Sequence, residues 1–375
     1  MKYRQFGSLD SKVSALGFGC MRLPVNGSSE NIDFPEATKM LRYAIDHGVN
    51  YVDTAYGYHG GNSENLVGEA LKDGYREKVN LATKLPTWMV ETEADFDRLL
   101  NEQLERLQTD KIDMYLLHAL NKERWELMKK LDVFSWVDQI LADGKIGCIG
   151  FSFHDDYEVF EDIINGYDGW AFTQIQYNYL NEEEQAGTRG LELAAEKGIA
   201  VIVMEPLLGG NLVKAPDAIQ QLWESAPVKR TPAEWALQWL WNKPETAVIL
   251  SGMSTMEQVE QNLESAERSR VGLLEQKELD LVGVVRDTYA ELRPIPCTSC
   301  EYCLPCPHGV AIPTNLNMYN DGYMYNTMDQ AQKQYNGMDE EKRASQCTAC
   351  KECEDKCPQS IVISEWMECI SSTLK

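Results

Sequence analysis

The chain has no uninterrupted apolar run of the length needed to cross a bilayer as a helix. Lys2 and Arg4 give the first residues a basic start, but no apolar segment follows them. A secretory signal peptide needs such a segment. These absences predict a soluble, cytoplasmic protein without a membrane partner.

An excess of positive charge is also lacking, since 35 Lys and Arg face 59 Asp and Glu and the net charge is −24. Nucleic-acid phosphates would repel such a chain at long range, which argues against a nucleic-acid partner. The acidic balance fits high solubility or a basic protein partner. The length of 375 residues allows one large domain and a small second one.

Cysteine, in contrast, is plentiful, and eight of the 11 cysteines lie in two short runs. The first run is Cys297, Cys300, Cys303 and Cys306, followed by Pro307, and the second is Cys347, Cys350, Cys353 and Cys357, followed by Pro358. The second run has the C-x2-C-x2-C-x3-C-P spacing of bacterial ferredoxins, in which the fourth cysteine binds the other cluster. The first run departs from this pattern, because only two residues precede its fourth cysteine.

The spacing predicts two [4Fe-4S] clusters with crossed ligands. Cys297, Cys300, Cys303 and Cys357 would hold one cluster, and Cys347, Cys350, Cys353 and Cys306 the other. Two four-cysteine zinc sites are the alternative, because tetrahedral thiolates also suit zinc. Two runs that each close with proline favour clusters. Disulfides are disfavoured, because closely spaced thiols without an export signal point to metal binding in a reducing compartment.

Before the cysteines, short apolar runs rich in β-branched residues alternate with amphipathic segments. The runs predict eight strands, at residues 13–18, 49–54, 79–84, 112–118, 147–152, 172–176, 199–204 and 247–251. Helices are expected at 37–47, 64–72, 96–107, 134–142, 157–165, 190–197, 232–241 and 256–265. Ser254 and Glu257 form a capping-box pattern that marks the start of the last of these helices. Eight strand–helix units predict a (β/α)8 TIM barrel.

The character of the chain changes at the stiff segment Arg293-Pro294-Ile295-Pro296. We therefore expect a barrel domain over residues 1–292 and a second domain over residues 293–375. The stretch between the cysteine runs has few β-branched residues and resembles the helical two-cluster modules of oxidoreductase subunits. A small, mainly helical dicluster ferredoxin-like domain is expected there.

Three successive predicted strands end in or near residues that can do acid–base chemistry. Asp53 and Tyr58 follow the second strand, Lys84 closes the third and His118 closes the fourth. Taken singly, each has an ordinary structural explanation, such as a loop cap, a surface charge or a core histidine. Because the carboxyl ends of barrel strands share one face, the four side chains are expected to converge there.

The barrel region resembles the aldo-keto reductase family over essentially all of residues 1–290. The resemblance rests on Gly17-Phe18-Gly19, on D-T-A-x-x-Y from Asp53 to Tyr58, on Ser63-Glu64 with Gly68, and on the contexts of Lys84 and His118. It extends to Gly150-Phe151-Ser152, to Gln174-Ile175-Gln176-Tyr177-Asn178 and to Glu205-Pro206-Leu207.

This resemblance implies a catalytic tetrad of Asp53, Tyr58, Lys84 and His118. Tyr58 would donate a proton to a substrate carbonyl, Lys84 would lower the pKa of that phenol, Asp53 would orient Lys84 and His118 would position the carbonyl. The resemblance also implies NADPH or NADH contacts at Met21, Asp53, Ser152, Gln174, Leu207, Ser254, Gln258 and Asn262. Two residues depart from the family pattern: Met204 replaces an aromatic residue at the nicotinamide, and Gln258 replaces an arginine for the 2′-phosphate.

Nicotinamide delivers two electrons as hydride, whereas an iron–sulfur cluster passes one electron at a time. A bound FMN, near the glycines of residues 208–211 and 251–254, is one way to connect them. Three hypotheses follow: a carbonyl reductase using NAD(P)H, a ferredoxin-linked reductase, with or without a flavin, supplied by a ferredoxin or flavodoxin, and a non-enzymatic electron-transfer module. The substrate is expected to be a small carbonyl compound, in a pocket lined by Tyr56, Trp88 and residues 121–125.

Overall fold

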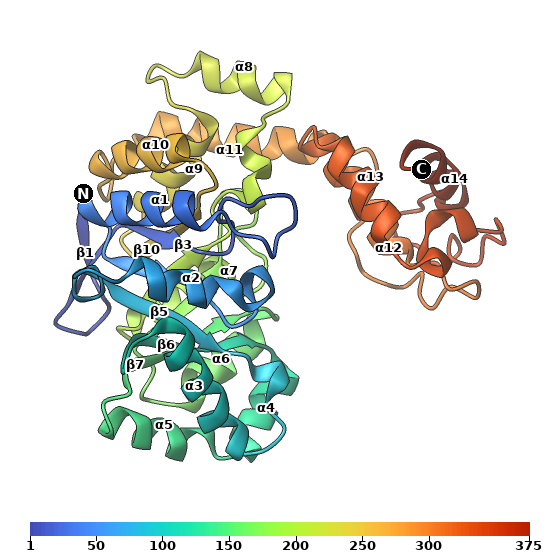
Figure 1. Ribbon diagram of the computed structural model, residues 1–375. Coiled ribbons are helices and arrows are strands. Elements are labelled where there is room, and N and C mark those ends of the chain that lie inside the picture. Colours follow the sequence, from blue (N-terminus) through green and yellow to red (C-terminus); the bar gives the residue numbers. More distant parts are fainter. The chain divides into compact units, whose positions relative to one another are not determined.

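The computed structural model describes residues 1–375, and its larger part is a closed barrel of eight parallel strands (Figure 1). The strands follow one another around the barrel in chain order, and β10 closes it by pairing with β3. Their bounds are β3 Leu16–Gly19, β4 Tyr51–Asp53, β5 Asn80–Leu85, β6 Ile112–Leu120, β7 Ile146–Phe153, β8 Phe172–Gln176, β9 Ala200–Met204 and β10 Thr246–Gly252. The predicted TIM barrel is confirmed.

Helices connect the strands, as the alternating pattern predicts. They are α1 Phe34–Asp46, α2 Asn62–Ala70, α3 Ala94–Leu107, α4 Lys122–Lys130, α5 Val133–Ala142, α6 Tyr157–Gly166, α7 Gly187–Glu196, α9 Pro232–Trp241 and α10 Met256–Glu267. Each expected helix has a counterpart within a few residues. Helix α4 was not expected, because its sequence KERWELMKK is largely polar.

An N-terminal hairpin closes one end of the barrel. Strands β1 Tyr3–Gln5 and β2 Lys12–Ser14 pair antiparallel, so the predicted strand at 13–18 is in fact two elements, β2 and β3. Phe6, in the hairpin turn, is fully buried and lies 5.5 Å from Phe172 and 6.5 Å from Tyr51 between ring centroids. Burial of one such phenyl ring contributes about 1.5–3 kcal/mol.

The start of α10 differs by one residue from the capping box predicted at Ser254 and Glu257. Thr255 is the N-cap, and its hydroxyl accepts a hydrogen bond from the backbone N–H of Gln258 at 3.3 Å. The side chain of Gln258 in turn accepts from the backbone N–H of Ser254 at 2.8 Å. A reciprocal capping arrangement is therefore present, but Thr255 and Gln258 form it.

By its internal contacts the chain divides into two compact units. One comprises Met1–Leu208 and Glu234–Glu275, and the other Gly209–Ala233 and Gln276–Lys375. The second unit contains α8 Asp217–Ser225, α11 Gln276–Glu291, α12 Ile312–Met324, α13 Met328–Gly337 and α14 Ile363–Thr373. It is helical, as predicted. The expected domain boundary after Leu292 stays a prediction, since this division places α11 with the second unit.

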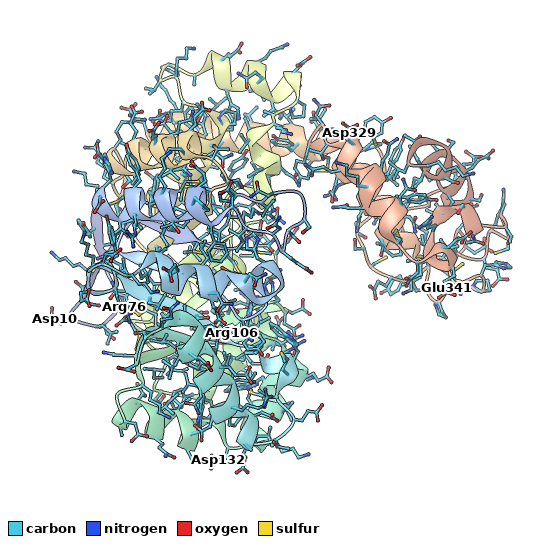
Figure 2. All side chains as sticks on the ribbon, in the orientation of Figure 1. Asp10, Arg76, Arg106, Asp132, Asp329 and Glu341 are labelled. Atoms are coloured by element: carbon cyan, nitrogen blue, oxygen red, sulfur yellow. The ribbon has the colours of Figure 1, made fainter.

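The core of the C-terminal helices is apolar, and cysteines border it. Ile312, Leu316 and Met367 are among its buried residues. Cys297 belongs to this core as well, and five more of the eight clustered cysteines pack against it. Acidic side chains point outward on both units, as Asp10, Asp132, Asp329 and Glu341 show (Figure 2). No helix is long and apolar enough to cross a membrane.

Candidate active site and cysteine pockets

The carboxyl ends of β4, β5 and β6 bring together Asp53, Lys84 and His118. Asp53 is the last residue of β4, Lys84 lies near the end of β5 and His118 near the end of β6. Tyr58 begins the short helix η1 Tyr58–Gly61, directly after the β4 loop. In a parallel barrel these ends share one rim, where such barrels carry their active sites.

The ammonium group of Lys84 is the centre of this group. Its Nζ donates to Asp53 Oδ1 at 2.7 Å, to the backbone oxygen of Thr54 at 2.8 Å and to Tyr58 Oη at 3.2 Å. Lys84 is 0 % exposed and Asp53 is 2 % exposed. All three N–H donors of the ammonium therefore have an acceptor. Because Tyr58 Oη accepts from Lys84, its own O–H remains available to donate elsewhere.

The pKa values of this group follow from burial and charge. Burial pulls the pKa of Lys84 down, but Asp53 and Tyr58 outweigh it and the pKa is raised above its ordinary value. Burial raises the pKa of Tyr58, and the opposing effect of Lys84 is smaller. The expectation that Lys84 would bring the phenol below its ordinary pKa is therefore wrong as a net direction. The phenol is a protonated donor at neutral pH.

His118 faces the phenol as a neutral imidazole. The two rings are edge to face, with centroids 6.1 Å apart. The pKa of His118 lies well below its ordinary value, mainly because the ring is buried and further because Lys84, His154 and Arg124 are positive neighbours. Its Nδ1 is buried without a hydrogen-bond partner. An uncharged imidazole at this place can form a hydrogen bond without adding a charge.

The residues expected to contact a nicotinamide coenzyme lie along the same rim. Ser152 at the end of β7 and Gln174 in β8 are paired in register. The Oγ of Ser152 accepts from the backbone N–H of Ala119 at 2.7 Å. Gln174 Nε2 lies 3.6 Å from the sulfur of Met204, while its Oε1 is buried without a partner.

The other expected contacts follow β3, β9 and β10. Met21 is exposed after β3, and Leu207 is half-buried after β9. Ser254 donates through Oγ to the backbone oxygen of Arg22 at 2.8 Å, and Asn262 donates to Ser251 Oγ at 3.0 Å. Ser254 and Gln258 are brought together by the α10 cap, so both have structural roles there.

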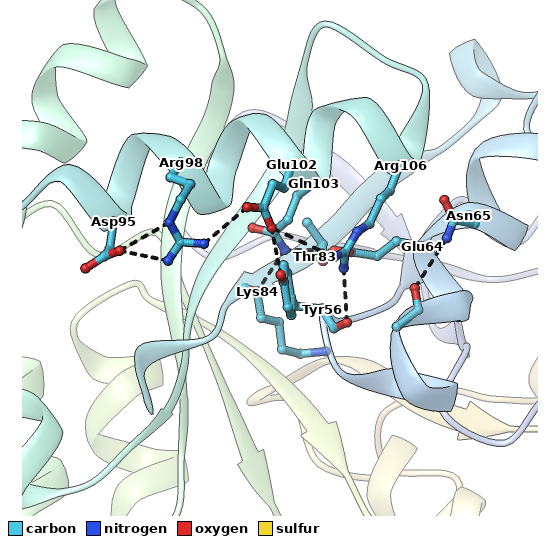
Figure 3. A network of polar contacts seen from close by, with 11 residues as sticks. Tyr56, Glu64, Asn65, Thr83, Lys84, Asp95, Arg98, Glu102, Gln103 and Arg106 are labelled. Carbon is cyan, nitrogen blue, oxygen red and sulfur yellow. Dashed lines mark hydrogen bonds and ion pairs between the residues drawn. The ribbon is translucent and has the colours of Figure 1, made fainter. Parts of the chain in front are cut away.

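A buried polar network lies behind Lys84 (Figure 3). Gln103 Nε2 of α3 donates to Glu64 Oε1 at 2.8 Å, to Thr83 Oγ1 at 3.1 Å and to the backbone oxygen of Lys84 at 3.0 Å. Thr83 also donates to Glu64 at 2.6 Å, and Arg106 to the other Glu64 oxygen at 3.3 Å. The network links α2, α3 and β5 beneath Lys84.

One of the three pocket predictions, that of Tyr56, differs from the structure. Tyr56 donates its hydroxyl to Glu102 at 2.7 Å, and the guanidinium of Arg106 lies 4.0 Å from its ring, so Tyr56 faces α3 (Figure 3). Trp125 is buried and donates to Asp162 at 2.7 Å. Trp88, in contrast, is 47 % exposed and its ring lies 4.9 Å from that of His118.

Arg124 lies within residues 121–125, which were expected to line the pocket, although the sequence did not single it out. It lies near the start of α4, with its guanidinium carbon 5.6 Å from the ring centroid of Trp88. Its Nη1 donates to the backbone oxygen of Ala119 at 2.7 Å. An arginine after an asparagine N-cap is an ordinary surface feature, so only the fold reveals its closeness to His118.

The clustered cysteines line two pockets of the C-terminal unit in the predicted crossed arrangement. One pocket of about 320 Å³ is lined by Cys297, Cys300, Cys303 and Cys357. The other, of about 310 Å³, is lined by Cys306, Cys347, Cys350 and Cys353. No group of three or more His, Cys, Asp or Glu side chains is arranged to hold a single metal ion.

The two cysteine loops share a backbone conformation. Ser299 and Glu301 have positive φ in the first loop, at 55° and 62°, and Ala349 and Lys351 take the same places in the second, at 55° and 66°. Non-glycine residues seldom adopt this region, and such alternation turns backbone N–H groups inward. The three remaining cysteines lie outside both pockets, with Cys148 in the barrel core and Cys20 buried after β3. Cys369 Sγ lies 3.4 Å from Tyr319 Oη.

Comparisons with known proteins agree with this division of the chain. The model of the aldo/keto reductase family matches residues 15–277, and the model of the 4Fe-4S dicluster domain matches residues 296–362. The 6-dehydroglucose reductase of Novosphingobium aromaticivorans is 28% identical over 284 residues, which cover 70% of this chain and 90% of that protein.

Two solved structures resemble the barrel. The holo form of an aldo-keto reductase from Bacillus halodurans has a TM-score of 0.64 and 28% identity, and the match covers 76% of this chain and 96% of that one. An aldo/keto reductase from Klebsiella pneumoniae in complex with NADP and acetate has a TM-score of 0.59 and 26% identity, with 76% and 95% covered.

Proposed function

The chain belongs to the aldo/keto reductase family, and from this premise we propose that it reduces the carbonyl group of a small aldehyde or ketone with NADPH or NADH. The third hypothesis, a barrel that only carries electrons, is set aside because the family consists of oxidoreductases. A bound nicotinamide supplies the hydride that reaches the carbonyl carbon. The remaining steps belong to side chains of the barrel rim.

The observation that carries the proposal is the hydrogen-bonding of Tyr58. Its oxygen accepts from Lys84 at 3.2 Å, so the phenolic proton is free to be donated to a carbonyl oxygen. The Lys84 charge stabilises the phenolate that remains, and Asp53 holds Lys84 in place through the 2.7 Å contact. Neutral His118 offers a second hydrogen bond to the same carbonyl oxygen.

The rim also fits a coenzyme. Gln174 Oε1 is buried without a partner and can accept from the carboxamide of a nicotinamide. Asp53, Ser152, Asn262, Met21 and Leu207 are the further contacts that we propose, together with Ser254 and Gln258 at the N-terminus of α10. Because Gln258 carries no charge for a 2′-phosphate and already caps α10, we propose that both NADPH and NADH are accepted.

A pair of tyrosines two residues apart tests the role of Tyr58. Tyr58→Phe removes the proton donor, and kcat for carbonyl reduction should fall about 100-fold or more, as for loss of a general acid. Tyr56→Phe is the matched control, because its hydroxyl contacts Glu102 on α3, and its kcat should stay within about twofold of the wild type. Equal activity of Tyr58→Phe and the wild type would remove the proposed acid.

We further propose that the two cysteine pockets hold two [4Fe-4S] clusters. Each pocket is lined by four thiols, and a cluster needs a separate thiolate on each of its four irons. Such clusters pass single electrons. Reconstituted protein should contain about eight iron atoms per chain. Cys357→Ser should lower this count, whereas Cys369→Ser, outside both pockets, should not.

The dicluster domain favours one second candidate function. In it, the clusters supply electrons to a substrate at the barrel mouth, from a ferredoxin or flavodoxin and by way of FMN. Anaerobic titration of the protein with NADPH and then NADH tests this circuit. Bleaching of the iron–sulfur absorbance would connect the nicotinamide to the clusters, and flavin in the acid extract would identify the converter. Cytoplasmic location stays a prediction.

A further inference from the structure

The barrel mouth contains a cation without an acidic partner. Arg124 donates to the backbone oxygen of Ala119 at 2.7 Å and makes no ion pair with any carboxylate. Arg42, Arg76 and Arg98, in contrast, each pair with a carboxylate. A guanidinium has five N–H donors, so most of those of Arg124 remain free.

Arg124 is connected to the proposed catalytic site through an aromatic platform. Its guanidinium carbon lies 5.6 Å from the ring centroid of Trp88, and that ring lies 4.9 Å from the ring of His118. The guanidinium carbon is therefore at most about 10.5 Å from the imidazole centre. Trp88 is 47 % exposed, so its indole offers a surface to a ligand.

The segments that carry these groups are tied to one another. Thr87, next to Trp88, donates through Oγ1 to the backbone oxygen of His118 at 2.6 Å. Asn121 caps α4 by accepting from the backbone N–H of Arg124 at 2.9 Å. The cation, the indole and the imidazole are therefore held as one surface, and a molecule with its carbonyl beside His118 extends over Trp88 toward Arg124.

We propose that Arg124 binds a carboxylate of the substrate, so that the enzyme prefers a short aldehyde or ketone that carries an acid group. This inference rests on the proposed carbonyl reduction and adds its substrate class. A guanidinium pairs with a carboxylate through two parallel hydrogen bonds, and an aromatic face beside it holds the connecting carbon chain. In a chain with a net charge of −24, a cation at the mouth also opposes the long-range repulsion of an anionic substrate.

Two aldehydes of equal chain length test the inference. 4-Oxobutanoate has a terminal carboxylate, and butanal does not. For the full chain with its clusters, kcat/KM for 4-oxobutanoate should be at least about tenfold above that for butanal. Arg124→Gln should raise KM for 4-oxobutanoate about 10- to 100-fold, equivalent to about 1.4–2.8 kcal/mol, with kcat little changed. Butanal kinetics should stay within about twofold. Arg124→Lys keeps the charge and should recover part of the loss.

Arg189→Gln is the matched control. Arg189 also lies over an aromatic ring, 3.7 Å from Tyr157, but it belongs to α7 and faces α6. This variant should leave both aldehydes unaffected. Equal kcat/KM for the two aldehydes in the wild type, or an equal loss for both in Arg124→Gln, overturns the inference.

Binding separates this inference from the proposed function. If neither aldehyde is reduced, carbonyl reduction itself fails for this class, and calorimetric titration with succinate then decides about the carboxylate site. Succinate binding to the wild type that Arg124→Gln abolishes supports the site. Absence of binding to the wild type overturns it.

Discussion

The buried pair of Asp53 and Lys84 makes a quantitative prediction about stability. Asp53→Asn keeps the shape and one oxygen acceptor but removes the negative charge 2.7 Å from Lys84 Nζ. Lys84 is 0 % exposed, so its charge loses its compensation without access to water. Loss of one partner from a buried pair costs about 3–5 kcal/mol of the free energy of unfolding.

The same change has a defined dependence on pH. In the wild type, folding raises the pKa of Lys84. The charge of Lys84 therefore stabilises the fold fully at a pH below its pKa in the unfolded chain, and this stabilisation is lost as the pH rises through its pKa in the folded protein. In Asp53→Asn only Tyr58 opposes the lowering of the Lys84 pKa by burial. We therefore expect the pKa of Lys84 to be lower in the folded variant than in its unfolded chain. The unfolded chain then binds more protons, and the variant gains stability as pH rises between these two pKa values. The difference from the wild type should shrink from pH 7 toward pH 10.

Urea unfolding of the two proteins at several pH values measures this difference. The control is Asp73→Asn, whose carboxylate pairs with Arg42 at 2.8 Å but is 74 % exposed. An exposed pair contributes about 1 kcal/mol or less, so this control should change little. The reasoning would be refuted if Asp53→Asn lost as little unfolding free energy at pH 7 as the control. It would also be refuted if the loss of unfolding free energy grew with pH.

Two more predictions concern the same site. Because burial raises the pKa of Tyr58, its acid form persists to high pH, so kcat/KM for carbonyl reduction should be level from pH 7 to about 10 and fall only above it; a fall centred below pH 9 contradicts this assignment. Gln103→Leu removes the hydrogen bonds that Gln103 donates to Glu64, Thr83 and the backbone of Lys84. The free energy of unfolding in urea should fall by about 2–4 kcal/mol, and kcat should fall as well. Unchanged kcat in the folded variant would show that the network does not position Lys84.

The barrel was predictable because its strands carry a local signal. Strand β9, with the sequence AVIVM, is apolar throughout, as expected for a parallel strand covered on both faces. The N-terminal hairpin was not separated from β3, because the sequence of a short β-rich run does not show which strand it pairs with in the fold. Helix α4 was missed because its polar sequence lacks a clear apolar stripe. Its asparagine N-cap is the one sequence signal of its start.

The candidate site was predictable as a set of residues but not in its electrostatics. Motif and strand-end position identified Asp53, Tyr58, Lys84 and His118. They could not reveal that burial raises the pKa of Tyr58 against the effect of Lys84. Burial and contact depend on residues distant in sequence.

Residues beside the mouth illustrate the same limit. Tyr56 lies two residues before Tyr58 yet faces α3, and the link from Arg124 through Trp88 joins two separate loops. The cysteine spacing, by contrast, predicted the crossed sets that line the two pockets, including Cys306, where the spacing departs from the ferredoxin pattern.

The origin of the hydrogen added to the carbonyl carbon tests the account most directly. The full protein is given a carbonyl substrate and NADPH deuterated at the transferable C4 position, and the alcohol is analysed by mass spectrometry. The account predicts one deuterium on the former carbonyl carbon. An alcohol formed without deuterium would contradict it, because the electrons would then reach the substrate without direct hydride transfer from the nicotinamide.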